Sequence, residues 1–341
     1  MTFGRGIDKL QDSLRNKSPL IGFAHCILPL DECSTVLTKF GAFYQGSVLS
    51  YQLQSFDSSF MILSNLEICN TNTLCNFHLP NLPLSFVSEQ FDDKWSVTEN
   101  EKAILAKLQI SEQESISYER ETILQSKCDL WFSLRKNRIT STNAHRTYQR
   151  KRSFSNLAET ILNPPSSTDL PKRTQDLFNH GKTYEPIARN AYSDAMKLKL
   201  NRNVILRETG IVIQPMLYWL AASPDGIFFD PTSDTLGLLE IKCPATRKNL
   251  TPKELMEDET FYIGLDAEEK PYLKRDHHMG YFTQIQFAMG LAGIKFCDFI
   301  VYTLKGVIIA RTSFDKDYFE SLVKKCNNFY TKFMLPKLCS T

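Results

Sequence analysis

Two carboxylates and a lysine in the second half of the chain have residue types and a spacing that suit metal-dependent hydrolysis. Asp225 lies in a Ser-Pro-Asp-Gly turn, and Glu240 and Lys242 lie in the next apolar run. Side chains alternate along a strand, so we expect Glu240 and Lys242 on one face and Ile241 in the core. A hairpin between the turn and this run would bring Asp225 next to Glu240.

Two carboxylates that converge in this way repel each other unless a cation joins them. Oxygen ligands favour a hard cation, Mg²⁺ or Mn²⁺, which also binds phosphate oxygens. We expect Asp225 and Glu240 as ligands, with the main-chain carbonyl of Ile241 as a further one. Lys242 would lie beside the attacking water, where it can orient or deprotonate that water and offset charge on the phosphate. These residue types are also common on solvated turns and edge strands, so the chemistry depends on their surroundings.

Short apolar runs around these residues predict a central sheet. The runs cover residues 210–213, 218–222, 226–229 and 238–242. Turns with Pro215, Pro224 and Pro231 separate them. A strand pair is also predicted over residues 299–303 and 307–310. Helices are predicted over residues 130–146, 183–197 and 277–292, and from Asp315 as N-cap to the end of the chain.

Composition and the pattern of apolar and polar residues divide the chain into three parts. Residues 1–95 carry short apolar runs between Ser, Asn and Asp, and we expect a strand-containing region of unknown function there. Residues 96–117 are predicted to form a helical connector, with Thr98 as an N-cap. Residues 118–341 contain the candidate chemistry and form the third part, an α/β domain.

Charge and cysteine usage restrict the class of protein. A net charge of +2 and a pI near 8.0 exclude a uniformly basic nucleic-acid-binding domain. The local run Arg146, Arg150, Lys151 and Arg152 suits a track for a DNA backbone, and a solvated charged loop is the alternative. Nine cysteines at irregular spacings are typical of a reducing, intracellular compartment. No apolar stretch reaches the roughly 20 residues of a membrane helix, so no membrane association is expected.

The segments around the candidate residues resemble a known family. Residues 223–226 and 239–244 are similar to the core of the YqaJ-type viral recombinase, or lambda-exonuclease-like, family of the PD-(D/E)XK nuclease superfamily. Further blocks follow the family order, and they are Gln125 to Trp131 with Arg135 and residues 138–142, then residues 181–185, residues 281–286 and residues 297–299. Such blocks are weak singly and strong in the right order. The resemblance covers roughly residues 110 to 338.

This resemblance implies a restriction-endonuclease-like fold, in which helices flank a central mixed sheet. It implies hydrolysis of DNA with Mg²⁺ or Mn²⁺, in the 5′-to-3′ direction from duplex ends with a 5′-phosphate, in recombination, repair or DNA processing. Polarity rests on the resemblance alone. A structure-specific endonuclease or RNA nuclease on the same scaffold is one alternative, and a catalytically inactive DNA-binding module is another.

The resemblance also assigns further site residues. Glu185 would complete the acidic cluster and bind the metal, although Pro186 directly after it suggests that the helix begins or kinks there. Arg135, Thr142 and Ser223 would hold the 5′-phosphate, with Thr142 in place of the usual serine.

Two glutamines follow in the later block. Gln284 and Gln286 are two apart on a helix and cannot share a face, so we select Gln284 as a donor in the active site. The resemblance further leaves a homo-oligomer and a strand-annealing partner open, and implies nuclear localisation if the source is eukaryotic.

Overall fold

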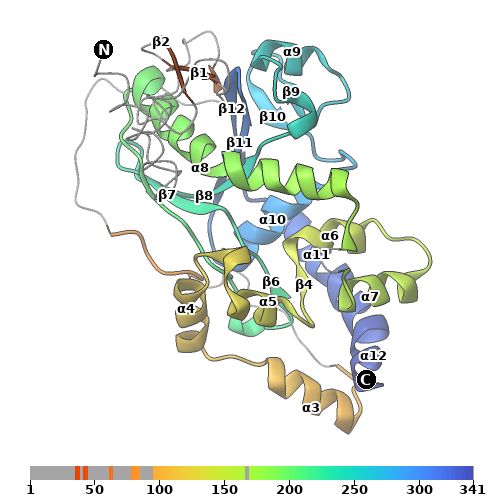
Figure 1. The fold of residues 1–341 in the computed structure, drawn as a ribbon. Helices are drawn as coiled ribbons and strands as arrows, with labels where there is room; N and C mark the ends of the chain where they lie inside the picture. Colours follow the sequence, from red (N-terminus) through yellow and green to blue (C-terminus); the bar gives the residue numbers. More distant parts are fainter. Residues whose placement is uncertain are drawn as a thin grey trace, which may run out of the picture. The chain divides into compact units, whose positions relative to one another are not determined.

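The computed structural model describes residues 35–38, 41–44, 61–63, 78–84, 95–165 and 169–340 (Figure 1). The chain forms two compact units, Met1–Ser59 and Phe60–Thr341. In the first unit, β1 (Thr35–Thr38) and β2 (Gly41–Tyr44) pair as an antiparallel hairpin. Most of the predicted region 1–95 lies outside the described residues. The boundary predicted near residue 95 falls inside the second unit, because β3 (Met61–Leu63) pairs with a strand near the C-terminus.

A six-stranded mixed sheet forms the centre of the second unit. Its strand order is β3-β12-β11-β8-β7-β5. The remaining bounds are β5 (Ile205–Arg207), β7 (Gly226–Asp230), β8 (Thr235–Lys242), β11 (Phe296–Thr303) and β12 (Gly306–Ser313). The pairs β11/β8 and β12/β3 are parallel and the other pairs are antiparallel. The predicted hairpin between the Asp225 turn and Glu240 is therefore present as β7 and β8.

Helices cover both faces of this sheet. Asp298 and Phe299 are neighbours on β11, so their side chains point to opposite faces. Tyr192 of α8 (Lys172–Leu200) donates its hydroxyl to Asp298 at 2.8 Å. Tyr281 of α10 (Tyr281–Ala292) packs its ring 5.5 Å from that of Phe299. Figure 1 shows α8 running across the strands that it contacts, β8, β11 and β12. The predicted fold class, a mixed sheet flanked by helices, is confirmed.

The other elements surround this core. The helices are α3 (Glu99–Leu108), α4 (Glu112–Glu121), α5 (Asp129–Arg135), α6 (Ser141–Tyr148), α7 (Phe154–Leu162), α9 (Pro252–Glu257), α11 (Lys316–Phe329) and α12 (Leu335–Cys339). The predicted N-caps are confirmed, because Thr98 forms a capping box on α3 and Asp315 caps α11. Gly293 ends α10 in the left-handed conformation. None of the helices in the described ranges is long and apolar enough to span a membrane.

Two helix predictions were wrong in their bounds. The helix predicted over residues 130–146 is broken into α5 and α6 by the short strand β4 (Ile139–Thr140). Buried Arg138 lies at the break and donates to three main-chain carbonyls, those of Leu108, Leu134 and Tyr218. A tertiary contact network therefore replaces the helical hydrogen bonds there.

The helix around Glu185 does not begin at Pro186. It starts at Lys172, and Pro186 lies in its interior with an exposed side chain. An interior proline costs about 3 kcal/mol in an isolated helix. Here Ala188, Tyr192 and Ala195 are fully buried on the inner face of α8. Their packing against the sheet offsets that cost.

The first two runs of the predicted sheet lie elsewhere. Residues 210–213 form only an isolated bridge between Val212 and Ala222. The run at residues 218–222 contains β6 (Leu220–Ala221), which pairs with β4 in a separate two-stranded sheet. These runs are apolar because their side chains are divided between two cores. A small core contains Ile211, Ile213 and Ala221 with Leu134, and the main core contains Val212, Leu220 and Ala222. A second small sheet joins β9 (Ile263–Leu265) and β10 (Pro271–Leu273).

Candidate active site

Asp225 lies where β7 begins and faces the next strand. The antiparallel register pairs Gly226 with Leu239, and Asp225 is one position further along. Its main-chain N–H donates to the carbonyl of Leu239 at 3.1 Å. Its carboxylate oxygen Oδ2 accepts the N–H of Ile241 at 2.6 Å. Asp225 is thereby fixed directly opposite Glu240.

The residue before Asp225 is held just as firmly. The carbonyl of Pro224 accepts hydrogen bonds from Gln125 Nε2 at 2.9 Å and from Thr209 Oγ1 at 2.6 Å. Gln125 also donates to the carbonyl of Thr209 at 3.0 Å. Hydrogen bonds from two other segments of the chain therefore fix the position of the Pro-Asp-Gly turn.

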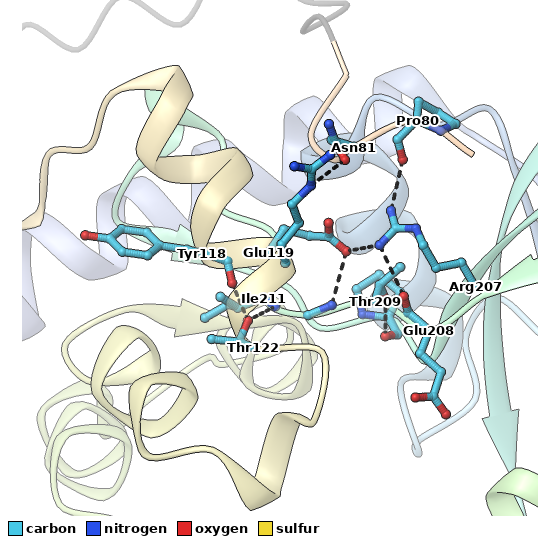
Figure 2. A network of polar contacts seen from close by, with 12 residues as sticks. Pro80, Asn81, Tyr118, Glu119, Thr122, Arg207, Glu208, Thr209 and Ile211 are labelled. Atoms are coloured by element: carbon cyan, nitrogen blue, oxygen red, sulfur yellow. Dashed lines mark hydrogen bonds and ion pairs between the residues drawn. The ribbon is translucent and has the colours of Figure 1, made fainter. Parts of the chain in front are cut away.

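The segment that supplies Thr209 belongs to a buried polar network (Figure 2). Arg207 donates to Glu119 Oε1 at 2.7 Å and to the carbonyl of Pro80 at 2.9 Å. Glu119 is fully buried and also accepts the N–H of Gly210 at 3.2 Å. A Cβ atom on Gly210 would lie 2.0 Å from the Glu119 carbonyl, so only glycine fits there. This network connects α4 to the turn that carries Asp225.

Glu240 and Lys242 share the face of β8 that α10 covers. Oε1 of Glu240 accepts a hydrogen bond from Lys242 Nζ at 2.5 Å and another from Gln284 Nε2 at 2.6 Å. Lys242 Nζ also lies 5.0 Å from the ring centre of Tyr281. Glu240 is 3% exposed and Ile241 is 6% exposed. The period-two pattern thus brings the acid, the lysine and one helical glutamine together.

The two glutamines of α10 have different surroundings. Gln284 points to Glu240, whereas Gln286 is buried and serves the end of β12. The side chain of Gln286 donates to the carbonyl of Ser313 at 2.9 Å and accepts the N–H of Asp315 at 2.8 Å. Gln286 therefore stabilises the connection to α11, and within the described residues it makes no hydrogen bond to Asp225, Glu240 or Glu185.

Glu185 comes to the site from the opposite side, on α8. Its Oε1 accepts a hydrogen bond from Arg189 Nη2 at 2.9 Å, one turn further along the helix. The same nitrogen donates to the main-chain carbonyl of Asp225 at 3.0 Å. Arg189 Nη1 pairs with Glu208 Oε1 at 2.5 Å. One guanidinium group thus contacts Glu185, Asp225 and Glu208.

Burial shifts the pKa values of all three acids upward. It raises the pKa of Glu185 and that of Glu240 to about 7, and the negative charge of Asp225 adds to both shifts. Burial also raises the pKa of Asp225. Burial alone would lower the pKa of Lys242, but the carboxylates of Glu240 and Asp225 outweigh it and raise that pKa. Burial therefore favours the protonated form of these acids, and a further positive charge nearby would favour the ionised form.

The donor chemistry of this site fits a divalent cation. Among the described residues no three His, Cys, Asp or Glu side chains already converge as a metal cage. Asp225 Oδ1 and Glu240 Oε2 accept no hydrogen bond from the described part of the chain, whereas the other oxygen of each carboxylate does. A cation there would offset the burial that raises the pKa values of both acids, and also the charge of Asp225 that adds to the shift of Glu240. Asp225 and Glu240 are the residues best placed to hold it, with Glu185 as the third acid.

Two of the residues predicted to bind a phosphate, Arg135 and Ser223, are connected through Trp131. Trp131 donates its indole N–H to Ser223 Oγ at 2.9 Å, and the guanidinium of Arg135 lies 4.1 Å from the centre of the Trp131 ring. No acidic side chain of the described residues pairs with Arg135, and burial lowers its pKa to about 10. An arginine that no described acid neutralises, and that is connected to Ser223 through Trp131, is suited to an anion.

The remaining predicted phosphate contacts lie outside this group. Thr142 is exposed in the first turn of α6, with its Oγ1 2.9 Å from that of Thr140. Arg152 is exposed just before α7. The structure therefore connects Arg135 with Ser223, whereas Thr142 and Arg152 are exposed and have no contact with this pair among the described residues.

Sequence reasoning missed four residues that hold the site. Arg189 could have been found, because it lies four positions after Glu185 on a helix, where opposite charges pair. Glu208 and Thr209 carry no such signal, since only the fold brings them to Arg189 and to Pro224. Gln125 was part of a family block but had no role assigned.

Comparison with known proteins agrees with these features. Residues 130–295 match the family model of the YqaJ-like viral recombinase domain, which confirms the family that the sequence blocks predicted. The matched range contains all of the predicted site residues. No curated protein sequence matches the chain significantly.

Several solved structures are similar at low identity. The alkaline exonuclease LHK-Exo from Laribacter hongkongensis is 21% identical, over 62% of this chain and 93% of that chain, with a TM-score of 0.43. A KSHV SOX RNA complex is 14% identical, over 67% and 76%, with a TM-score of 0.43. The shutoff and exonuclease protein from Kaposi's sarcoma associated herpesvirus is 13% identical, over 64% and 72%, with a TM-score of 0.41. The family assignment itself rests on the match over residues 130–295.

Proposed function

Residues 130–295 form a YqaJ-like viral recombinase domain, and from this premise we propose that the chain is a metal-dependent DNA nuclease. We further propose that it degrades duplex DNA from 5′-phosphorylated ends in the 5′-to-3′ direction. The biological setting would be recombination, repair or DNA processing.

One observation carries this proposal. Asp225 and Glu240 lie opposite each other on β7 and β8, and each has a carboxylate oxygen that no described residue satisfies. Two carboxylates side by side in a largely buried site are costly unless a cation binds them. A Mg²⁺ or Mn²⁺ ion at this place would polarise a phosphodiester and lower the barrier to attack by water.

The residues around these acids have separate tasks. Lys242 is held on Glu240 as a cation, so its remaining N–H groups can orient a water molecule and offset charge that develops on the phosphate. Gln284 holds the same oxygen of Glu240 and leaves the other oxygen directed elsewhere. Glu185 adds a third negative group from α8.

The preference for an end is assigned to Arg135 and Ser223. Arginine binds a phosphate with two parallel hydrogen bonds, and a terminal phosphate offers one more oxygen than an internal one. Trp131 holds both residues in place through its ring and its indole N–H. Thr142 and Arg152 would contact the same strand from α6 and from the loop before α7.

Product analysis of the wild-type protein tests the proposal. Linear duplex labelled at the 3′ end, closed circular DNA and RNA are each incubated with Mg²⁺, and with EDTA as control. We expect progressive shortening of the linear duplex from its 5′ ends, no cleavage of the circle, and no activity with EDTA. Cleavage of the circle would show an endonuclease, preferential degradation of RNA would show an RNA nuclease, and DNA binding without hydrolysis would show an inactive module.

A further inference from the structure

We propose that Arg189 is a positioning residue, which fixes the distance between Glu185 on α8 and Asp225 at the start of β7 so that both can bind one cation site. The inference rests on the proposed metal-dependent function. Arg189 is not among the site residues predicted from the sequence.

The geometry puts a single group between two elements. Nη2 of Arg189 donates to the Glu185 carboxylate at 2.9 Å and to the Asp225 main-chain carbonyl at 3.0 Å. The Glu185 carboxylate lies on α8, and the Asp225 carbonyl lies directly before β7 in the central sheet. A planar guanidinium fixes the direction of its hydrogen bonds, whereas a lysine ammonium would not.

The other arm of the guanidinium is anchored on a third element. Nη1 pairs with Glu208, the residue directly after β5. The neighbouring Arg207 is fixed by Glu119 and by the carbonyl of Pro80, and Figure 2 shows Glu208 directed away from that group. Glu208 therefore presents its carboxylate to Arg189.

Burial makes this arrangement sensitive to change. The side chain of Arg189 is 12% exposed, and its Nε is buried without a hydrogen-bond partner. A charge taken from water in this way is retained only where acids surround it. Glu185 and Glu208 supply those acids, so the position of Arg189 and that of Glu185 depend on each other.

A purely stabilising role of Arg189 would have a different effect on cation affinity. If Arg189 only stabilised the fold, its replacement would lower stability and leave the cation affinity of the folded protein unchanged. If it positions Glu185 relative to Asp225, its replacement changes cation affinity even when the protein stays folded. Replacement by lysine keeps the positive charge, so it isolates the geometry of the fork from the charge itself.

The test compares Arg189→Lys with Arg311→Lys. Arg311 is a matched control, because its side chain is 13% exposed and it pairs with buried Asp298 on β11 instead of with Glu185, Asp225 or Glu240. Mn²⁺ binding is measured on the DNA-free proteins by electron paramagnetic resonance, together with unfolding temperature. Single-turnover cleavage and DNA affinity are measured in parallel.

We expect Arg189→Lys to bind Mn²⁺ about 10-fold more weakly, by analogy with residues that support metal ligands. Its cleavage rate should fall while its DNA affinity stays within about twofold of wild type. Arg311→Lys should bind Mn²⁺ as wild type does, even if it unfolds at a lower temperature. Unchanged Mn²⁺ affinity in Arg189→Lys, or an equal loss in both variants, overturns the inference.

Glu208→Gln provides the second variant if Arg189→Lys does not fold. The Glu208 side chain is 48% exposed, so the substitution is mild, and it weakens only the outer anchor of Arg189. We expect a smaller loss of Mn²⁺ affinity in the same direction, and no loss would overturn the inference. A wild-type protein that binds Mn²⁺ but cleaves no DNA would reject the proposed function and leave this inference standing, whereas a wild-type protein that binds no Mn²⁺ rejects both.

Discussion

Gln284 of α10 donates its side-chain amide to Oε1 of Glu240 at 2.6 Å, on the same oxygen that accepts Lys242. Both donors are on one side of the carboxylate, so the other oxygen of Glu240 is kept apart from protein donors. The helix thus determines which oxygen of Glu240 is available to a cation.

The two glutamines of α10 should respond differently to the same substitution. Gln284→Leu removes one donor to Glu240, and we expect cleavage to fall about 10- to 100-fold with little loss of stability. Gln286→Leu leaves the carbonyl of Ser313 and the N–H of Asp315 unpaired, and we expect a loss of about 1 to 3 kcal/mol of stability. Denaturant unfolding and single-turnover cleavage distinguish these effects. A stability loss in Gln284→Leu as large as that in Gln286→Leu would contradict the account.

Cation binding should depend on pH through the raised pKa values of Glu185 and Glu240. Their pKa values in the fold are about 7, above the usual value of 4.5. The metal-free fold therefore binds more protons than the unfolded chain between these values, and it loses stability as the pH rises from about 4.5 to 7. Above pH 7 both groups are ionised and the loss is complete.

A cation needs the ionised carboxylates, so it must displace protons below pH 7. We expect Mg²⁺ to raise the unfolding temperature more at pH 8 than at pH 6. As the pH falls below 7, the affinity for Mg²⁺ should decrease by as much as about 10-fold per pH unit for each proton that the cation displaces. Differential scanning fluorimetry with and without Mg²⁺ across this range measures both. A stabilisation by Mg²⁺ that is equal at pH 6 and pH 8 would rule out these acids as the binding site.

Arg135 should control the preference for a phosphorylated end. Because no described acid neutralises its charge, replacement by glutamine removes a free cation from the predicted phosphate pocket. We expect Arg135→Gln to lose about 10-fold in the initial rate on 5′-phosphorylated duplex and to change little on 5′-hydroxyl duplex. Equal losses on the two substrates would assign Arg135 a general role in DNA binding instead.

The network in Figure 2 should be essential for the fold. A Cβ atom at Gly210 would lie 2.0 Å from the Glu119 carbonyl and 2.4 Å from Thr122 Oγ1. We expect Gly210→Ala to destabilise the protein by about 1 to 3 kcal/mol, as other overpacked sites do. Gly181→Ala is a suitable control, since nothing lies within 4 Å of its Cβ position. Similar unfolding free energies in the two variants would contradict the tight approach of Glu119 to Gly210.

The sequence predicted the parts of the site that depend on short periodicities. Alternation along β8 placed Glu240 and Lys242 together, and helical spacing separated Gln284 from Gln286. Signals that depend on tertiary contacts were missed. The break between α5 and α6 follows from the buried hydrogen bonds of Arg138, and the length of α8 follows from packing that outweighs Pro186.

The same distinction applies to the strands. An apolar run predicts burial, but it does not say in which sheet, so residues 210–213 and 218–222 were assigned to the central sheet although they lie beside it. Likewise Glu208 meets Arg189 only because β5 is the edge strand next to β7. Pairings between elements far apart in sequence required the fold.

Glu240→Gln gives the most direct test of the central claim, that Asp225 and Glu240 bind the cation that cleaves DNA. Glutamine has the same shape and can still accept from Lys242 and Gln284, but it removes one ligand charge. Single-turnover cleavage of 5′-phosphorylated duplex in Mg²⁺ is compared with wild type, with DNA affinity measured in the same samples. We predict a loss on the order of 10²- to 10³-fold in cleavage rate with unchanged DNA affinity. A variant that cleaves as fast as the wild-type protein would contradict the account.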